Sequence, residues 1–234
     1  MFYTKPFGID AFIEKSMLIK NNWIYGLLIF SAVSAMLALN NFGFIFKSGT
    51  AGIGIIILSL LNLRKAKPLK EVWMIVAAFL FSIAGDWFLS HSNNDSLMFS
   101  KGIALFFFAH IGYLSYALFN GKIKWLTTSI LLIVFLIYFF VLLYPTFDDT
   151  VLMIASLIYL FISCLSFGAS LGMKGDSVVK WTYVFGIFLV LFSDTIISLT
   201  DFLGYESLGF LILPTYYLAH IVITFSLMRK INLS

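Results

Sequence analysis

Two aspartates and two histidines stand inside long apolar runs of the sequence, where ionisable side chains are rare. Asp86 lies in "FSIAGDWFLS" and Asp194 in "LFSDTIISL", while His110 lies in "FFFAHIGYL" and His220 in "YYLAHIVIT". A charged side chain at membrane depth costs about 3 kcal/mol or more, so such residues face a bundle interior or a water-filled cavity and usually serve a function. The two carboxylates are therefore the first candidates for chemistry.

A pair of carboxylates in one cavity is suited to acid–base catalysis. Mutual repulsion and desolvation keep one of them protonated while the other stays ionised, so that the pair supplies an acid and a base. Either aspartate could be the acid. The sequence favours Asp86, because Trp87 and Phe88 would make its surroundings apolar. It favours an ionised Asp194, because the flanking serine and threonine offer hydrogen-bond donors.

Further polar side chains accompany these residues at helical spacing. Asp194, Ser198 and Asp201 stand at i, i+4 and i+7, which is one face of a helix, and that face cannot look at lipid. Asp201 precedes Gly204 closely, so a role at a helix end is an equal alternative for it. Lys47 could extend to lipid head groups or bind an anionic group. The candidate substrate-binding or supporting residues are Lys47, His110, Tyr113, Ser193, Ser198, Asp201, Tyr216, Tyr217 and His220.

The sequence predicts no metal site and no cofactor. It contains one cysteine, Cys164, inside an apolar run, and no H-x-x-x-H pair lies on one helix face. A buried small side chain is the simplest interpretation of this cysteine.

The composition indicates an integral membrane protein. Hydrophobic residues make up 61% of the 234 positions and charged residues 11%, whereas soluble domains carry roughly 25% charged residues. The net charge of +4 comes from residues placed between apolar runs. These charges are topology signals and not a nucleic-acid-binding surface.

Eight apolar runs are long enough to cross a bilayer, which takes about 20 helical residues. They are residues 22–40, 45–63, 71–90, 97–119, 124–144, 150–172, 180–202 and 207–228. We therefore expect an all-α, multi-pass membrane protein, in the inner or plasma membrane if its source is bacterial. Residues 22–230 would form a single transmembrane domain, and residues 1–21 a cytoplasmic segment that lies on the membrane surface.

The cationic residues predict the orientation. All but two of the 15 lysines and arginines fall before the first run, after the last, or in the loops that share their side. The exceptions are Lys47 and Lys101. By the positive-inside rule, both termini are cytoplasmic.

The order of the polar residues suggests an internal duplication. Asp86 and Asp194 lie on the third and seventh runs, and His110 and His220 on the fourth and eighth, each within the letters "AHI". The chain would then consist of two parallel repeats, residues 22–119 and 124–230, related by an axis along the membrane normal. Chance similarity between apolar segments is the alternative.

Taken together, "GDWFL", "FFFAHIGYL", "LFSDTIISL" and "YYLAHIVI" on these runs resemble the YhhN-like lysoplasmalogenase family. The resemblance extends from about Lys47 to Thr224. Family members often have Lys-Pro where this chain has Lys47-Ser48, and Gln where it has His220. Position 220 would then require a hydrogen-bonding group and not specifically a base.

The resemblance implies hydrolysis of the vinyl ether bond of lysoplasmalogens to a fatty aldehyde and glycerophosphoethanolamine or glycerophosphocholine. The partners would be a lysophospholipid substrate and membrane lipids. Protonation of the vinyl ether double bond gives an oxocarbenium ion, and glycosidases handle a comparable ion with two carboxylates. Asp86 and Asp194 would be the catalytic pair.

Two other functions remain open from the residues alone. Carboxylates within membranes also form proton relays, so a proton-coupled transporter of small molecules or lipids is one alternative. A metal-dependent membrane lipid hydrolase is the other. The sequence leaves the oligomeric state open.

Overall fold

The computed structural model describes residues 23–92 and 95–234, and the regular secondary structure of these residues is helical. The predicted surface segment, residues 1–21, lies outside the described residues. The elements are η1 (Trp23–Leu27), α2 (Leu28–Leu39), α3 (Phe44–Leu63), α4 (Val72–Ser90), α5 (Ser96–Phe119), α6 (Trp125–Tyr138), η2 (Phe139–Leu143), η3 (Tyr144–Thr146), α7 (Thr150–Leu171), α8 (Ser177–Leu203), η4 (Glu206–Leu211) and α9 (Ile212–Leu233).

Seven helical segments are long and apolar enough to span a membrane, and they match the second to eighth predicted runs. The chain is thus a multi-pass integral membrane protein. Within the described residues the first run forms a shorter apolar helix, Ile24–Leu39. This described part is about 24 Å long at 1.5 Å per residue, below the roughly 30 Å of a hydrocarbon core. The helix ends there because Asn41 (φ 61°) and Gly43 (φ 109°) adopt positive φ angles that continue no right-handed helix.

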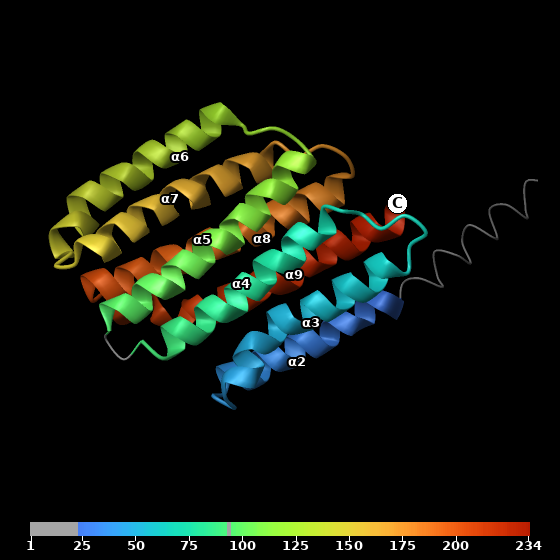
Figure 1. The fold of residues 1–234 in the computed structure, drawn as a ribbon, viewed down its shortest axis with the longest axis horizontal. Helices are drawn as coiled ribbons and strands as arrows, with labels where there is room; N and C mark the ends of the chain where they lie inside the picture. The colour runs from blue at the N-terminus through green and yellow to red at the C-terminus, as the bar shows by residue number, and fades with distance from the viewer. Residues whose placement is uncertain (1–22, 93–94) are drawn as a thin grey trace, which may run out of the picture.

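Helices α4, α5, α8 and α9 form the centre of the bundle, with the α2–α3 pair at one edge and the α6–α7 pair at the other (Figure 1). Helix α5 packs against α7, and α9 packs against α3, so the last helix of each predicted half contacts the second helix of the other. This reciprocal contact is the one that two parallel repeats would make, and the duplication itself stays a prediction.

The two edges of the bundle are packed differently. Helix α2 contacts both α3 and α9, whereas α6 packs chiefly on α7. Helix α6 also changes at Phe139 into the π-helical turn η2, which precedes Pro145. A proline has no N–H to continue the helical ladder, and π-helical turns often accompany functional sites. The turn directs Phe139 and Leu143 into the bundle, where both are buried.

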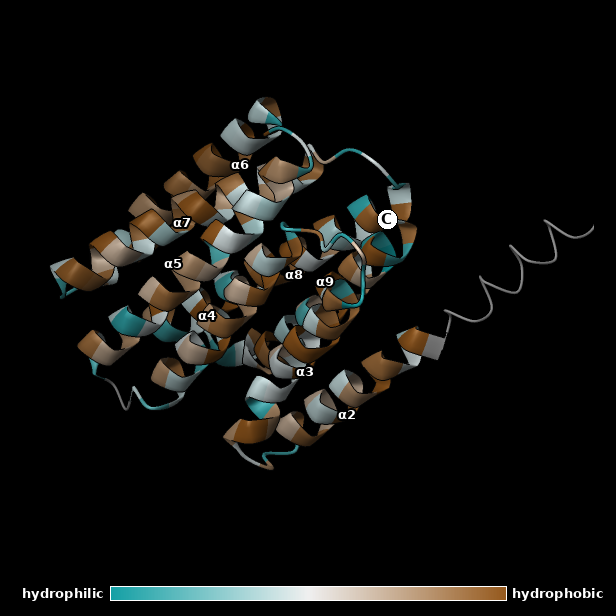
Figure 2. Ribbon diagram, turned by 45° about the vertical axis from the view of Figure 1, so that its right-hand side comes forward, coloured by the Kyte–Doolittle hydropathy of each residue, from teal (hydrophilic) through white to brown (hydrophobic). Residues whose placement is uncertain are grey.

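The outward faces of the edge helices are apolar, as a lipid environment requires. Large side chains of α2 and α6 are exposed, Leu126 among them at 79% of its surface. Figure 2 shows hydrophobic colour over the helices, while hydrophilic colour gathers in the connecting segments.

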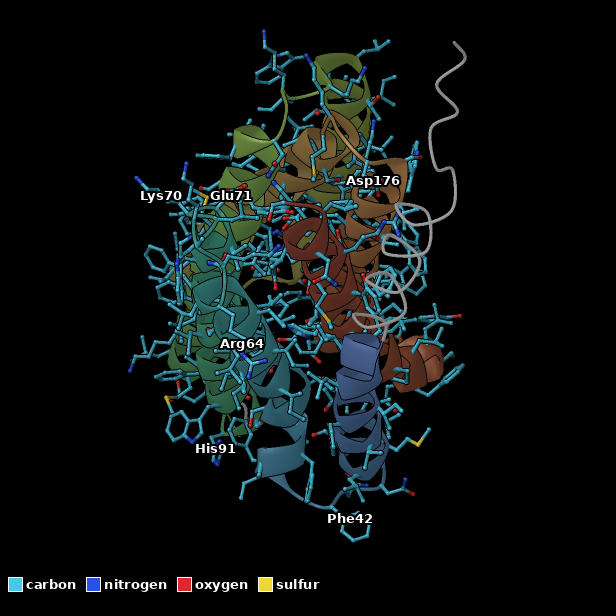
Figure 3. All side chains as sticks on the ribbon, turned by 90° about the vertical axis from the view of Figure 1, so that its right-hand side faces the viewer. Phe42, Arg64, Lys70, Glu71, His91 and Asp176 are labelled. Carbon is cyan, nitrogen blue, oxygen red and sulfur yellow. The ribbon has the colours of Figure 1, made fainter. Side chains whose placement is uncertain are left out.

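The connecting segments define two ends of the bundle. The cation-poor end carries residues 40–43, 91–92 with Asp95, 147–149 and 204–205, and the cation-rich end carries residues 64–71, 120–124, 172–176 and the C-terminus. In Figure 3 Phe42 and His91 lie at the former end and Lys70, Glu71 and Asp176 at the latter.

Ion pairs join the helices at the cation-rich end. Lys230 Nζ lies 2.9 Å from Oε1 of the buried Glu71, and Arg229 pairs with Asp176. Tyr25 and Asn232 are hydrogen bonded, so the first described helix starts where the chain ends. The cytoplasmic location of this end remains a prediction from the lysines.

Candidate active site

A polar cavity of about 310 Å³ opens among α3, α4, α5, α8 and α9 toward the cation-poor end. Asp86 of α4 and Asp194 of α8 both line it, together with Lys47 and Asp201. The two carboxylates are 108 positions apart in the sequence, and they line the same cavity.

Asp86 has one hydrogen-bond donor and an aromatic neighbour. Tyr216 of α9 donates its hydroxyl to Asp86 Oδ2 over 3.1 Å. The residue before Asp86 is Gly85, and a Cβ there would lie 2.8 Å from the Phe106 ring, so α5 can approach α4 closely only because this position is glycine. Phe106 lines the cavity beside Asp86 and packs on the Tyr216 ring at 6.0 Å.

Trp87 and Phe88 do not surround Asp86, so the prediction that they make its environment apolar is wrong. Trp87 is 43% exposed and stacks on His91 with 4.7 Å between ring centroids, and Phe88 packs edge-on against Trp87. Neither residue lines the polar cavity. Successive side chains on a helix point about 100° apart, so the residues directly after Asp86 face elsewhere.

Asp194 receives its polar contacts from two other helices. Tyr159 of α7 donates its hydroxyl to Asp194 Oδ2 over 2.7 Å, and His110 Nε2 of α5 lies 3.5 Å from the same oxygen. The predicted donors are wrong, because the Ser193 hydroxyl donates to the Ile212 carbonyl and the Thr195 hydroxyl to the Leu191 carbonyl. The Ser193 hydrogen bond instead joins α8 to the first residue of α9.

The two histidines occupy matching sequence positions but different surroundings. His110 is fully buried; its Nε2 lies 3.5 Å from Asp194 Oδ2, and its ring nitrogens have no hydrogen-bond partner among the described residues. The His220 ring lies against Phe79, with centroids 4.8 Å apart, and its Nδ1 contacts the Tyr216 carbonyl at 3.1 Å. His220 lines neither cavity and supports the turn of α9 that carries Tyr216.

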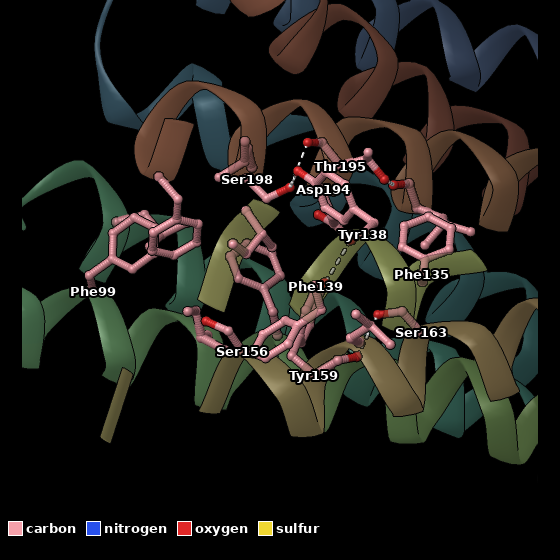
Figure 4. A pocket seen from close by; sticks show the side chains of 18 residues that line it. Phe99, Phe135, Tyr138, Phe139, Ser156, Tyr159, Ser163, Asp194, Thr195 and Ser198 are labelled. Carbon is pink, nitrogen blue, oxygen red and sulfur yellow. Dashed lines mark hydrogen bonds between the residues drawn. The ribbon is translucent and has the colours of Figure 1, made fainter. Parts of the chain in front are cut away.

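An apolar cavity of about 100 Å³ lies next to the polar one, among α5, α6, α7, α8 and η2. Its wall is mostly aliphatic and aromatic, with Phe99, Phe135 and Phe139 around Asp194 in Figure 4. Among the described residues Asp194 is the one carboxylate that lines both cavities. The site therefore consists of a polar and an apolar compartment that meet at Asp194.

The predicted face of Asp194, Ser198 and Asp201 is divided between the two compartments. Ser198 lines the apolar cavity and shares a 2.8 Å hydrogen bond with the Tyr138 hydroxyl. Asp201 lines the polar cavity near the end of α8, and Gly204, with φ 66°, terminates that helix. Asp201 does not cap the helix; its Oδ1 accepts a hydrogen bond from the neighbouring Thr200 hydroxyl, at 3.3 Å.

Of the two remaining predicted tyrosines, one lines a cavity and the other does not. Tyr217 lines the polar cavity, and its buried hydroxyl has no hydrogen-bond partner among the described residues. Tyr113 lies outside both cavities; its hydroxyl is 3.4 Å from Ser82 Oγ, and its carbonyl accepts a bond from Tyr183.

Sequence reasoning missed Tyr159 and Tyr138. Each is a hydroxyl-bearing aromatic inside an apolar run, which is the only local signal, because their partners lie on α8. The described residues contain no cluster of three or more His, Cys, Asp or Glu side chains that could hold a metal ion, and Cys164 is buried in α7.

One protein-family model matches the part of the chain that lines both cavities. The sequence model of the YhhN family matches residues 46–227, which include Lys47, both aspartates and both histidines. Comparison with curated proteins and with solved structures found no match. The family match covers most of the chain and agrees with the order of motifs on the helices, and the protein therefore belongs to the YhhN family.

Proposed function

We propose that the protein is a lysoplasmalogenase, which hydrolyses the vinyl ether bond of a lysophospholipid to a fatty aldehyde and a glycerophospho-base. The observation that carries the proposal is the meeting of two compartments at Asp194, with Asp86 on the wall of the polar one. Membership of the YhhN family agrees with this activity.

The two compartments correspond to the two parts of such a substrate. A lysoplasmalogen has a polar head group and glycerol on one side of its vinyl ether and a hydrocarbon chain on the other. The first methylene groups of the chain would enter the apolar cavity, and the head group with its glycerol would lie in the polar cavity. The vinyl ether then lies beside Asp194 and within the cavity that Asp86 lines.

The contacts favour Asp194 as the ionised carboxylate and Asp86 as the acid. One oxygen of Asp194 accepts the Tyr159 hydroxyl and lies next to His110, whereas Asp86 accepts one hydroxyl at a longer distance. Hydrogen bonds to a charged acceptor stabilise it more than neutral bonds do. The proton of the pair therefore resides on Asp86.

The reaction begins with transfer of the Asp86 proton to the vinyl carbon that is remote from the ether oxygen. The resulting oxocarbenium ion is stabilised by the Asp194 carboxylate, which also takes a proton from the water that adds to the carbon bearing the oxygen. The product is a hemiacetal. Asp194 then protonates the departing glycerol oxygen, while Asp86 accepts the hemiacetal hydroxyl proton, so the aldehyde leaves and both carboxyls return to their first state.

The test compares three lysolipids with the same head group and chain length, incubated with purified protein in detergent. The vinyl ether should be cleaved, and the saturated alkyl ether should not, because it cannot be protonated to an oxocarbenium ion. The ester should also resist, since the site holds no Ser–His–Asp arrangement for acyl transfer among its lining residues. Equal cleavage of ester and vinyl ether would refute the proposal. Detergent solution holds no gradient, so cleavage there also excludes coupled transport as the source of the signal.

A further inference from the structure

The polar cavity carries two opposite charges that the proposed proton transfers do not use. Lys47 of α3 and Asp201 of α8 both line its wall. Among the described residues neither side chain belongs to an ion pair. The cavity wall therefore presents a cation and an anion from separate helices.

These charges come from helix turns at the cation-poor end, and Asp194 lies deeper in the bundle. Lys47 is in the first turn of α3 and Asp201 in the last turn of α8, both at the cation-poor end. Asp194 is seven residues before Asp201 on the same helix, which is about 10 Å along its axis. In an extended lysolipid the phosphorus is six bonds from the vinyl ether carbon, about 7 Å at ordinary bond lengths, and the amine lies four bonds further. The spacing thus places a head group beside the two charges.

A buried donor without a partner indicates that the cavity accommodates a polar ligand. Tyr217 is 2% exposed and lines the cavity, and its hydroxyl has no hydrogen-bond partner among the described residues. Leaving a buried hydroxyl unpaired costs about 1–3 kcal/mol. A ligand with oxygen acceptors, such as a phosphate or a glycerol hydroxyl, would satisfy it.

We propose that Lys47 and Asp201 determine head-group specificity by binding the phosphate and the ammonium group, respectively, of a zwitterionic lysophospholipid. This proposal rests on the proposed function for the placement of the substrate. The cavity of about 310 Å³ is at the lower limit of the roughly 300–1,000 Å³ usual for small-molecule sites. It has room for a phosphoethanolamine head group with its glycerol, so the hydrocarbon chain would leave it at Asp194, where the apolar cavity adjoins.

The experiment measures binding of two saturated alkyl-ether lysolipids to purified protein in nanodiscs. Their head groups are phosphoethanolamine and phosphoglycerol, which are similar in length and share the phosphate, so that they differ in the ammonium charge. Unmodified protein should bind the phosphoethanolamine lipid about fourfold more tightly, the order expected of one partly solvated ion pair. Asp201→Asn should bring the ratio of the two dissociation constants close to one. Lys47→Met should weaken both lipids by a similar factor and keep the ratio.

Two exposed residues at the same end give matched controls. Asp148 and Lys101 line neither cavity, so Asp148→Asn and Lys101→Met should change neither affinity nor ratio. An unchanged ratio in Asp201→Asn, or a ratio that Lys47→Met abolishes, would overturn the assignment.

The binding measurement is independent of the reaction, because a saturated ether is not cleaved. Protein that shows an Asp201-dependent ratio but leaves the vinyl ether intact would refute the proposed hydrolysis and support the head-group site. Protein that cleaves the vinyl ether without an Asp201-dependent ratio would do the reverse.

Discussion

Asp86 and Asp194 lie on the third helix of each predicted half, yet their partners differ in number and origin. Asp86 accepts one hydrogen bond, from Tyr216, while Asp194 accepts a shorter one from Tyr159 and lies beside His110. Two similar helices thus hold their carboxylates in dissimilar environments. Acid–base chemistry needs this difference, because two equivalent carboxylates would have no fixed division of roles.

The same contrast is visible at the level of helices. In the first half α2 packs against both α3 and α9, whereas α6 in the second half packs chiefly on α7. The space that α6 and the η2 turn enclose with α5 and α8 is the apolar cavity beside Asp194. The position of α6 therefore supplies the apolar compartment beside Asp194, in which the proposed function places part of the hydrocarbon chain.

The largest expected effect comes from removing either carboxylate. We expect Asp86→Asn and Asp194→Asn each to lower kcat by at least about a hundredfold, as for loss of an acid or a base. The comparison becomes sharper in the pH–rate profile, which should be bell-shaped for the unmodified protein. Asp86→Asn should abolish the limb that falls at high pH, and Asp194→Asn the limb that falls at low pH.

Folding should survive both changes, because asparagine has the shape of aspartate and is easier to bury uncharged. Thermal unfolding of the detergent-solubilised variants is the control. Near-normal turnover in either variant would remove that residue from the mechanism, and loss of the opposite limb would exchange the two roles.

The helix spans could be predicted from sequence because the thickness of a bilayer fixes their length. The predicted runs near Asp86 and Asp194 agree with α4 and α8. The donor to Asp194 could not be predicted, since Tyr159 comes from α7, and side-chain contacts between distant helices leave no periodic signal. Local reasoning named Ser193 and Thr195 instead, whose hydroxyls bond to carbonyls.

The same limit explains another difference. Pro145 follows the π-helical turn at Phe139, and apolar periodicity does not encode this change within the run. Composition therefore predicts where apolar helices lie better than it predicts where a helix bends.

The histidines allow the second test of the comparison. His110→Gln should lower kcat about tenfold, because His110 supports the Asp194 carboxylate, whereas His220→Gln should cost about twofold, since His220 contacts the Tyr216 carbonyl and no carboxylate. Turnover of the two variants under saturating substrate measures the difference. Equal losses would indicate that the two halves work equivalently.

The tyrosines should give effects of similar size to those of the histidines. Tyr159→Phe removes the 2.7 Å hydrogen bond to Asp194, and Tyr216→Phe the 3.1 Å bond to Asp86. A bond to an ionised acceptor contributes more than one to a neutral carboxyl, so we expect losses of about tenfold and about threefold in kcat, respectively. The reverse order would contradict an ionised Asp194 and place the charge on Asp86.

The smallest effect is expected at the cation-rich end, far from both compartments. Arg229 donates from Nε to Asp176 Oδ1 (2.9 Å) and from Nη2 to Oδ2 (3.2 Å), and these bonds, with the Val179 amide, lower the pKa of Asp176 to about 2. A lowered carboxyl pKa stabilises the fold above the ordinary value near 4, and this contribution is lost as the pH falls from about 4 toward 2. The pair is thus intact throughout the range of a pH–rate profile above pH 4.

Asp176→Asn should lower the unfolding temperature near neutral pH by about 2 °C and leave kcat unchanged, and the difference in unfolding temperature should disappear near pH 2. A fall in kcat as large as that of Asp86→Asn would show that the two ends of the bundle are coupled. The difference between Asp86 and Asp194 would then depend on residues outside the two cavities.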